Sequence, residues 1–301
     1  VVTGGYAPDT PDSLTNLLRG SLAAAPQING IIVADKALKA VAVVRDARGA
    51  LPESRSLTIG PDSGLAELAK REGAFVVEDA AHSLGASYRD EAGKSYRSGS
   101  CSHSDAAILS FHPVKHVCAG EGGAVLTNDE TLARRARRLR SHGVERGEGW
   151  RYDQVELGYH YRMTEMQAAL GTSQIQKLDT FVRQRRRISA RYIDALRDAP
   201  FAERLRVANL DEGSSRHLFV VHFENGEARE AAYRFLRERG VFTQVHYFPV
   251  YRHSDYATPD GRRLVGAESY YAACLSLPLY PSLEDRQQER VIDELGRFFA
   301  R

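Results

Sequence analysis

A short apolar run without alternation limits most strongly what this chain can fold into. Residues 74–77 read Ala-Phe-Val-Val, and a short segment with apolar residues three and four apart precedes them at 65–71. A strand that is apolar on both sides is typical of a parallel sheet covered on both faces. A helix that leads into such a strand is half of a βαβ unit. The sequence therefore predicts an α/β fold.

The rest of the chain predicts further elements of both kinds. Short apolar segments, rich in small and β-branched residues, predict strands at 29–34, 40–44, 106–111, 124–127, 217–223 and 241–250. Helical spacing predicts helices at 130–140, 164–181, 183–197, 228–239 and 283–301. Asn128–Asp129 and Thr164 stand where helix caps are expected, because their side chains accept from free backbone N–H groups.

A change of pattern near residue 180 predicts a domain boundary. Residues 58–180 are expected to form a large domain with a mainly parallel sheet. The β-α-β run and the final helix within 181–301 predict a smaller α+β domain at the C-terminus. Residues 1–57 are interpreted as a divergent N-terminal segment of the large domain, and they show no clear motif.

Composition and charge exclude several classes of partner. The 301 residues carry 41 Lys and Arg against 39 Asp and Glu, a formal net charge of +2, so neither nucleic acid nor an anionic membrane is expected as a general partner. No apolar run is long enough to span a bilayer, and the first residues lack the pattern of a signal peptide. The three widely spaced cysteines fit neither a disulfide framework nor a metal site. These features favour a reducing cytoplasm.

Two acidic residues, Glu78 and Asp79, follow the strand predicted at 74–77. Ligands of open α/β sheets bind outside the carboxyl ends of the strands, and a carboxylate buried there needs a partner because its burial is costly. Asp79 is therefore placed to hold a cationic ring nitrogen. The alternative is that Asp79 caps a following helix, and this segment alone leaves both interpretations open.

A second polar group follows the strand predicted at 106–111. Ser110 stands near the end of that strand, and Lys115 lies in a loop rich in Pro and Gly that continues to residue 123. A lysine in a pocket loses its charge readily and forms Schiff bases, and glycine lets the backbone approach a ligand closely. Taken alone, a loop lysine is more often a surface residue, and the glycines lack the spacing of a P-loop.

The two groups together match the needs of pyridoxal phosphate. That cofactor requires a carboxylate on its pyridinium nitrogen, a lysine amine and donors to its phosphate. Asp79, Lys115 and Ser110 supply these three functions from the ends of two predicted strands. The sequence therefore predicts a pyridoxal phosphate site at the carboxyl edge of the sheet.

Five segments carry a resemblance to a known family: VVEDAAHSLGA, SFHPVKHVCAGEGGAVLTND, LGYHYRMTEMQAALG, FTQVHYFPVYRHSDY and AESYYAACLSLPLYPSLED. They resemble the DegT/DnrJ/EryC1/StrS sugar aminotransferases, from about residue 58 to the end. The last two resemble most the branch of the pseudaminic acid pathway. The resemblance implies the aspartate-aminotransferase-like fold (fold type I) and a homodimer whose active sites are shared between subunits.

The resemblance also assigns roles to individual residues. Lys115 would be the Schiff-base lysine and proton carrier, and Asp79 would pair with the pyridinium nitrogen of the cofactor. His82 falls near the cofactor ring, and Ser110 would bind the cofactor phosphate. His160 falls where many relatives have an Asn that reaches the phosphate of the neighbouring subunit.

The implied substrate is a nucleotide-linked keto-deoxysugar. The resemblance points to amination at C4 of a UDP-4-keto-6-deoxy-N-acetylhexosamine, with glutamate as the expected amino donor. His246 and Tyr247 fall in the segment that approaches the sugar nucleotide in relatives, and Arg162, close to His160 in the sequence, is the third candidate for substrate binding. The alternatives are a sugar 3-dehydratase, in which relatives replace the lysine by histidine or add an iron–sulfur cluster, and a non-catalytic relative.

The N-terminal segment motivates the non-catalytic alternative. Family members carry a Gly-Thr-type segment whose backbone N–H groups bind the cofactor phosphate at a helix N-terminus. Residues 41–51 resemble that segment only weakly, with Arg48-Gly49 in place of Gly-Thr. The sequence alone is therefore compatible both with a phosphate-binding segment here and with its loss.

Two basic runs, at 134–140 and 183–187, remain outside these motifs. They are more typical of solvated or subunit-facing helix surfaces than of nucleic-acid sites, because no aromatic residues interleave with them. One or two of the arginines are candidates to face a diphosphate, whose geometry guanidinium groups match.

Overall fold

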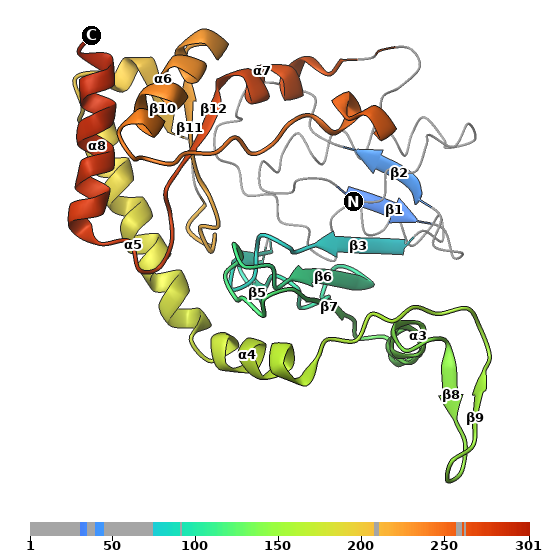
Figure 1. The fold of residues 1–301 in the computed structure, drawn as a ribbon. Helices are drawn as coiled ribbons and strands as arrows, with labels where there is room; N and C mark the ends of the chain where they lie inside the picture. Colours follow the sequence, from blue (N-terminus) through green and yellow to red (C-terminus); the bar gives the residue numbers. More distant parts are fainter. Residues whose placement is uncertain are drawn as a thin grey trace. The chain divides into compact units, whose positions relative to one another are not determined.

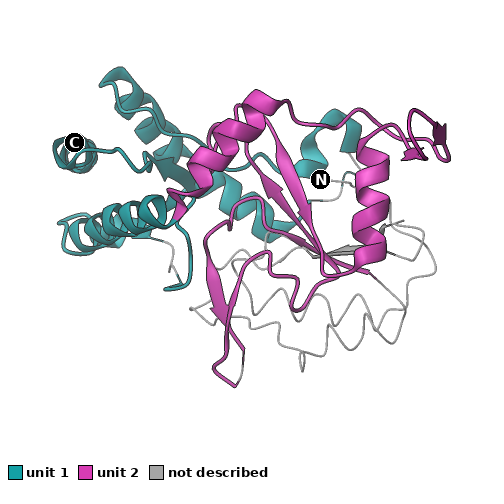
Figure 2. Cartoon of the chain, turned by 90° about the horizontal axis from the view of Figure 1, so that it is seen from below, with its two compact units in different colours: residues 1–30, 42–57, 179–301 teal, residues 31–41, 58–178 magenta. Residues whose placement is uncertain are grey.

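The computed structural model describes residues 31–34, 40–44, 75–90, 92–207, 211–256, 261 and 263–301 (Figure 1). Described residues from Phe75 to Leu178 belong to one compact unit and those from Asp179 to Arg301 to another (Figure 2). The three-part domain assignment stays a prediction. The helix predicted at 65–71 lies outside the described residues.

The sheet that contains β3 and β6 has the strand order β2-β1-β3-β6-β7. Its strands are β1 (Ile31–Ala34), β2 (Ala40–Val44), β3 (Phe75–Asp79), β6 (Ala106–Ser110) and β7 (Gly123–Leu126). The strands predicted in these regions are confirmed, and β3 continues to Asp79. β3 and β6 are parallel, whereas β1 is antiparallel to β3 and β7 to β6. A mainly parallel sheet therefore stays a prediction.

A hairpin follows β3 and precedes β6. It consists of β4 (Ser87–Arg89) and β5 (Ser95–Arg97). Tyr88 stacks on Tyr96 and its hydroxyl lies 2.7 Å from Nδ1 of His103. Burial of the Tyr88 hydroxyl raises its pKa to about 12. The rings of Tyr88 and Tyr96 also contact the ring of His103, which follows the hairpin.

Helix α3 (Glu130–Arg140) begins and ends where the sequence predicts it. Oδ1 of Asp129 accepts from the backbone N–H groups of Thr131 at 2.7 Å and Leu132 at 3.2 Å, which confirms the predicted cap. A second hairpin, β8 (Val144–Arg146) and β9 (Tyr152–Gln154), follows α3 and extends away from the sheet of this unit (Figure 1).

The helix predicted at 164–181 is corrected by a break before residue 178. Helix α4 (Glu165–Ile175) starts with the predicted Thr164 cap, and α5 (Leu178–Arg197) follows. The two helices differ in burial, because α4 buries none of its residues. The buried apolar residues of α5 are Leu178, Val182, Ile188, Tyr192 and Leu196.

The second unit packs helices on an antiparallel sheet with the order β10-β11-β12. The strands are β10 (Leu205–Val207), β11 (Phe219–Phe223) and β12 (Cys274–Leu277). The helices that follow α5 are α6 (Gly226–Glu238), α7 (Val265–Ala273) and α8 (Asp285–Phe299), with short 3₁₀ turns at Ala202–Arg204, Val250–Arg252 and Ser254–Tyr256. Tyr192, Phe219, Leu236 and Leu295 are fully buried in its core. The helices predicted at 228–239 and 283–301 are confirmed as α6 and α8.

The strand predicted at 241–250 is wrong. This segment alternates between buried Val241 and Thr243 and exposed neighbours, as a strand does, but it pairs with β12 only at Gln244 and Ser276. β12 is four residues long, and Pro249 has no N–H to donate, so the pairing does not continue.

The described residues contain no helix with the length and apolar character needed to cross a membrane.

Candidate active site

The carboxyl edge of β3 and β6 brings together the residues that the sequence predicts there. The two strands are parallel neighbours, with Asp79 opposite Ile108. Asp79 is the last residue of β3, and Ser110 is the last residue of β6. Because parallel strands end at the same edge of a sheet, both side chains start from one edge, where ligands of α/β sheets bind.

The two neighbouring carboxylates, Glu78 and Asp79, have different roles. Glu78 accepts a hydrogen bond of 2.6 Å from the hydroxyl of Ser98 and one of 3.1 Å from the backbone N–H of Gly99. Asp79 is exposed, and its Oδ1 accepts only from the N–H of Ala81, at 3.1 Å, among the contacts of the described residues. Residues 81–85 form turns rather than a helix, so the helix-cap interpretation of Asp79 is wrong.

Lys115 is held by the loop that joins β6 to β7. The backbone N–H of Lys115 donates to the carbonyl of His112 at 2.9 Å, and Ala119 closes the loop on Phe111 at the same distance. The buried residues Val117 and Ala119 anchor the loop. Gly123 must be a glycine because a Cβ there would lie 2.6 Å from the carbonyl oxygen of Leu109. The loop therefore has a fixed path around Lys115.

The surroundings of Lys115 change the pKa of its amine. Partial burial lowers its pKa, and the negative charge of Asp79 acts in the opposite direction. The lowered pKa favours the neutral amine, which is the form that attacks a carbonyl.

We expect the rate of pyridoxal phosphate uptake to rise with pH and to level off below the pKa of an exposed lysine. The sign follows from the lowered pKa of Lys115: its amine loses the proton at a lower pH, and only the neutral amine reacts. The rate is measured by absorbance, with Nα-acetyl-lysine as the reference. A midpoint at or above that of the reference amine would contradict this expectation.

The remaining predicted groups at this edge are Ser110 and His82. The partly buried Ser110 accepts a weak hydrogen bond of 3.4 Å from the N–H of His112, which leaves its own proton to donate. His82 lies in the turns that follow Asp79 and is partly buried. An exposed carboxylate, a lysine of lowered pKa and a hydroxyl thus start from one edge, and this donor set fits the cofactor.

The comparison with known families identifies the kind of chain. Residues 63–296 match the model of the DegT/DnrJ/EryC1/StrS aminotransferase family. The chain belongs to that family. The match includes both candidate loops and most of the second unit, so the family resemblance found in the five sequence segments is confirmed.

Individual members of the family show how far the likeness extends. The chain is 34% identical, over 77% of its length, to a UDP-4-amino-4,6-dideoxy-N-acetyl-beta-L-altrosamine transaminase of Campylobacter jejuni. It is 37% identical, over 79% of its length, to a dTDP-3-amino-3,4,6-trideoxy-alpha-D-glucose transaminase of Streptomyces venezuelae. In both comparisons the chain covers 60% of the relative.

A solved structure shows how far the likeness in fold extends. Helicobacter pylori PseC, an aminotransferase involved in the biosynthesis of pseudoaminic acid, superimposes with a TM-score of 0.72 at 27% identity. The superposition covers 78% of this chain and 62% of PseC. The chain therefore spans about three fifths of the length of these relatives.

The structure places His160 and Arg162 beside α3 rather than beside Lys115. His160 pairs with Ser141 in an isolated bridge, and its ring lies 5.0 Å from that of His142. A nitrogen of Arg162 lies 3.4 Å from Nε2 of His160. Both side chains are exposed. Their family roles toward a neighbouring subunit stay predictions.

His246 and Tyr247 lie in the second unit. Nδ1 of His246 is 2.8 Å from the hydroxyl of Ser276, so the imidazole orientation is fixed. Tyr247 is half-exposed, and its partial burial raises the pKa of its hydroxyl. Their roles toward a sugar nucleotide stay predictions. The phosphate-binding role of residues 41–51 also stays a prediction, because residues 45–51 lie outside the described residues.

Sequence reasoning missed a group of residues around α3. Arg146, Trp150 and Tyr152 line a pocket together with arginines of α3 and with Arg162. The arginine run at 134–140 was the available signal, but its partners come from a hairpin that the sequence does not predict.

Proposed function

We propose that this chain is a pyridoxal phosphate-dependent aminotransferase that transfers an amino group from glutamate to a nucleotide-linked keto-deoxysugar. The observation that carries the proposal is that Asp79 and Lys115 follow neighbouring parallel strands at one sheet edge, where the charge of Asp79 acts on the pKa of Lys115. A carboxylate and a lysine of lowered pKa at one sheet edge suit this cofactor. Membership of the aminotransferase family supports the same reaction class.

Each residue has a defined task in this proposal. Bound pyridoxal phosphate supplies an electron sink and carries the amino group between the two substrates. Asp79 holds a proton on the ring nitrogen through its negative charge. Ser110 donates to the phosphate, and His82 packs near the ring. The amine of Lys115 takes a proton from one carbon and returns it to another, which its lowered pKa favours.

The substrate we propose is a UDP-4-keto-6-deoxy-N-acetylhexosamine, aminated at C4. The Campylobacter jejuni relative has a UDP-linked 4-amino sugar in its name, whereas the Streptomyces venezuelae relative has a dTDP-linked 3-amino sugar. The resemblance of residues 242–256 to the first kind of enzyme favours the UDP sugar. Arg162, His246 and Tyr247 are the residues we propose for its binding.

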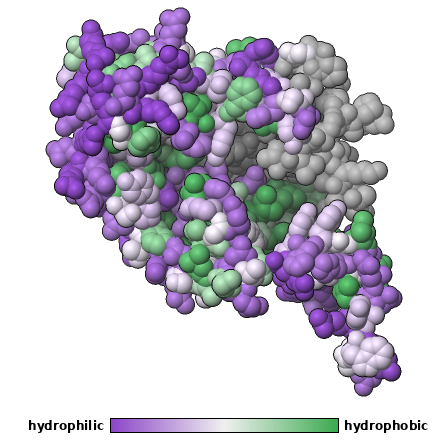
Figure 3. Space-filling view, in the orientation of Figure 1, coloured by the Kyte–Doolittle hydropathy of each residue, from purple (hydrophilic) through white to green (hydrophobic). Residues whose placement is uncertain are grey.

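We further propose a fold type I homodimer with a mainly parallel large sheet and active sites shared between subunits. Exposed apolar side chains gather near α4 and the segment before it, where Leu157 and Met166 are 79% and 81% exposed. Figure 3 shows hydrophobic patches on the surface over β6, β7 and α4. Exposed apolar patches of this kind mark interaction sites. His160 would act on the site of the partner subunit, and we place the enzyme in the cytoplasm because of its free cysteines.

The test is a pair of half-reactions on the whole chain supplied with pyridoxal phosphate. Glutamate should yield one equivalent of 2-oxoglutarate per bound cofactor, and the UDP-4-keto sugar should then take up the amino group. The dTDP-3-keto sugar is the matched comparison and should react more slowly. Consumption of the sugar without 2-oxoglutarate would indicate a dehydratase, and a folded chain that binds no pyridoxal phosphate would indicate the non-catalytic alternative.

A further inference from the structure

Strand β12 is buried along its whole length, yet it contains the polar residue Ser276, which is 5% exposed. A buried hydroxyl costs free energy unless it forms a hydrogen bond. The hydroxyl of Ser276 meets this need at Nδ1 of His246, which lies 2.8 Å away. The polar side chain in this strand is therefore explained by its contact with His246.

The backbone of Ser276 aligns the segment that carries His246. The N–H of Ser276 donates to the carbonyl of Gln244 at 2.7 Å, and the N–H of Gln244 donates to the carbonyl of Ser276 at 3.2 Å. These two hydrogen bonds form the isolated bridge between β12 and the segment at 241–250. The bridge lies two residues before His246, so it sets the distance at which the side chains of Ser276 and His246 meet.

A second side chain of β12 contacts the main chain of His246. Cys274 and Ser276 are two residues apart in one strand, so their side chains lie on the same face of the sheet. The thiol of Cys274 lies 3.9 Å from the carbonyl oxygen of His246. Burial raises the pKa of this thiol to about 11, so the thiol keeps the proton that it donates. One face of β12 thus contacts both the ring and the carbonyl of His246.

The hydrogen bond with Ser276 fixes the orientation of the imidazole. A serine hydroxyl both donates and accepts, so it holds the neutral ring in either tautomer and the charged ring as well. With Nδ1 turned toward β12, the direction of Nε2 is fixed too. A polar group that is held in one direction binds a ligand at a lower entropic cost than one that turns freely.

Burial separates the tasks of Ser276 and His246. Ser276 is too deeply buried to contact a ligand that arrives from solvent. His246 is only partly buried, and Tyr247, whose ring lies 4.7 Å from the ring of His246, is 55% exposed. A ligand at this place would meet His246 and Tyr247, and Ser276 would act on that ligand only through His246.

We infer that Ser276 is a positioning residue, which sets the affinity of the second unit for the sugar nucleotide by orienting His246. The inference rests on the proposed function, in which His246 contacts the sugar nucleotide. The proposed function gives His246 no task toward glutamate. The effect of Ser276 should therefore be confined to one of the two half-reactions.

Ser276→Ala should lower the rate of amination of the UDP-4-keto sugar, at limiting sugar, by about three- to tenfold, which corresponds to the net contribution of one hydrogen bond. The release of 2-oxoglutarate from glutamate should stay unchanged. Both half-reactions are measured separately, in single turnovers of the whole chain with pyridoxal phosphate. At saturating sugar the difference should disappear, because the substitution changes binding rather than chemistry. Ser276→Thr keeps the hydroxyl on a side chain that suits a strand, so it should retain most of the rate.

Ser189→Ala is the matched control. Ser189 of α5 is 1% exposed, and its hydroxyl has no hydrogen-bond partner among the residues that the structure describes. The same truncation of a buried hydroxyl should leave both half-reactions unchanged there. If Ser276→Ala slowed both half-reactions equally, or slowed neither of them, the inference would be overturned.

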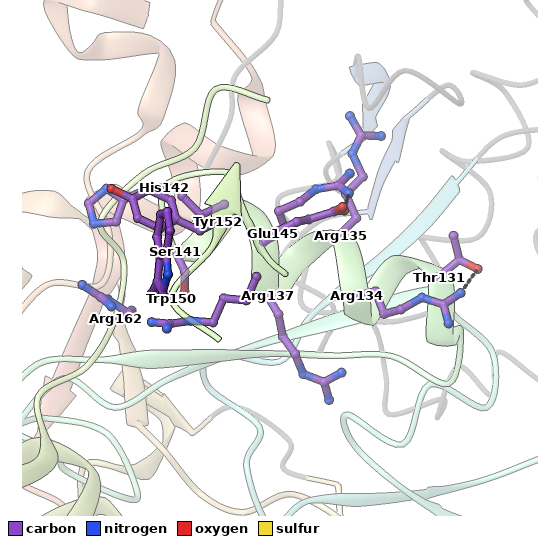
Figure 4. Close-up of a pocket in the computed structure, with 13 residues that line it drawn as sticks. Thr131, Arg134, Arg135, Arg137, Ser141, His142, Glu145, Trp150, Tyr152 and Arg162 are labelled. Atoms are coloured by element: carbon purple, nitrogen blue, oxygen red, sulfur yellow. Dashed lines mark hydrogen bonds and ion pairs between the residues drawn. The ribbon is translucent and has the colours of Figure 1, made fainter. Parts of the chain in front are cut away.

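Double substitutions test whether Ser276 acts through His246. In a His246→Ala chain, Ser276→Ala should have no further effect on sugar amination, because the residue through which it acts is already absent. In an Arg162→Ala chain the effect should persist, since Arg162 lines the pocket beside α3 (Figure 4) and lies 3.4 Å from His160. An undiminished effect of Ser276→Ala in the His246→Ala chain would overturn the inference.

The ring signals of His246 separate this inference from the proposed function. In nitrogen–proton correlation spectra of the histidine rings, Ser276→Ala should move the Nδ1 signal of His246, which is assigned by its loss in His246→Ala. Ser189→Ala should leave that signal in place. A moved signal in a chain that aminates no sugar would refute the proposed function and leave the orientation of His246 by Ser276 supported. Sugar amination by the unmodified chain together with an unmoved signal would refute the role of Ser276 alone.

Discussion

Lys115→Ala should reduce the release of 2-oxoglutarate from glutamate by at least about a thousandfold. The variant loses both the nucleophilic amine and the proton carrier, and general acid–base catalysis by one positioned group is worth about 10²–10⁴-fold. The measurement is a single-turnover assay of 2-oxoglutarate after saturation with pyridoxal phosphate. Lys115→Arg should be equally inactive, because a guanidinium keeps the positive charge but does not lose its proton.

Lys177→Ala is the matched control for this experiment. Lys177 lies exposed between α4 and α5, and the same truncation there should leave the rate within a factor of about two. Added methylamine should restore part of the activity of Lys115→Ala, since it supplies a free amine of similar basicity. Retained activity of Lys115→Ala without added amine would assign the proton transfer to a different residue.

The position of Lys115 and Asp79 at one edge is predictable because it depends on local patterns. The apolar run at 74–77 indicates a buried strand, and the ends of parallel neighbours meet at one edge. The bounds of α3 are predictable for a similar reason, since Asp129 satisfies the first free N–H groups of the helix.

The features that sequence reasoning missed depend on contacts between distant residues. β8 and β9 have three residues each, too few to show a period, and their pairing joins Val144 to Gln154. The arginine pocket depends on that hairpin, so the run at 134–140 alone did not indicate it. The segment at 241–250 has the alternation of a strand, but its pairing is limited by the length of β12. The length of β12 cannot be predicted from residues 241–250 alone.

Asp79→Asn should lower the rate of amino transfer by about 10²–10³-fold, the usual effect of removing one preorganised electrostatic group. The amide keeps the size of the side chain and its bond to the N–H of Ala81, but it no longer holds a proton on the ring nitrogen. Because the charge of Asp79 raises the pKa of Lys115, its removal should also move the pH midpoint of cofactor uptake to lower pH. Asp79→Glu should retain part of the rate of amino transfer, and its pH midpoint should lie closer to that of the unmodified chain.

Glu78→Gln is the matched control, because it removes the same charge from the neighbouring position of β3. Glu78 is bound to Ser98 and Gly99, so its substitution should lower the free energy of unfolding by about 1–3 kcal/mol and leave the pH midpoint unchanged. The two substitutions thus separate a charge that acts on Lys115 from a charge that holds a loop. If both variants lost stability and both kept the midpoint of the unmodified chain, Asp79 would be a structural residue and the electrostatic coupling to Lys115 would be absent.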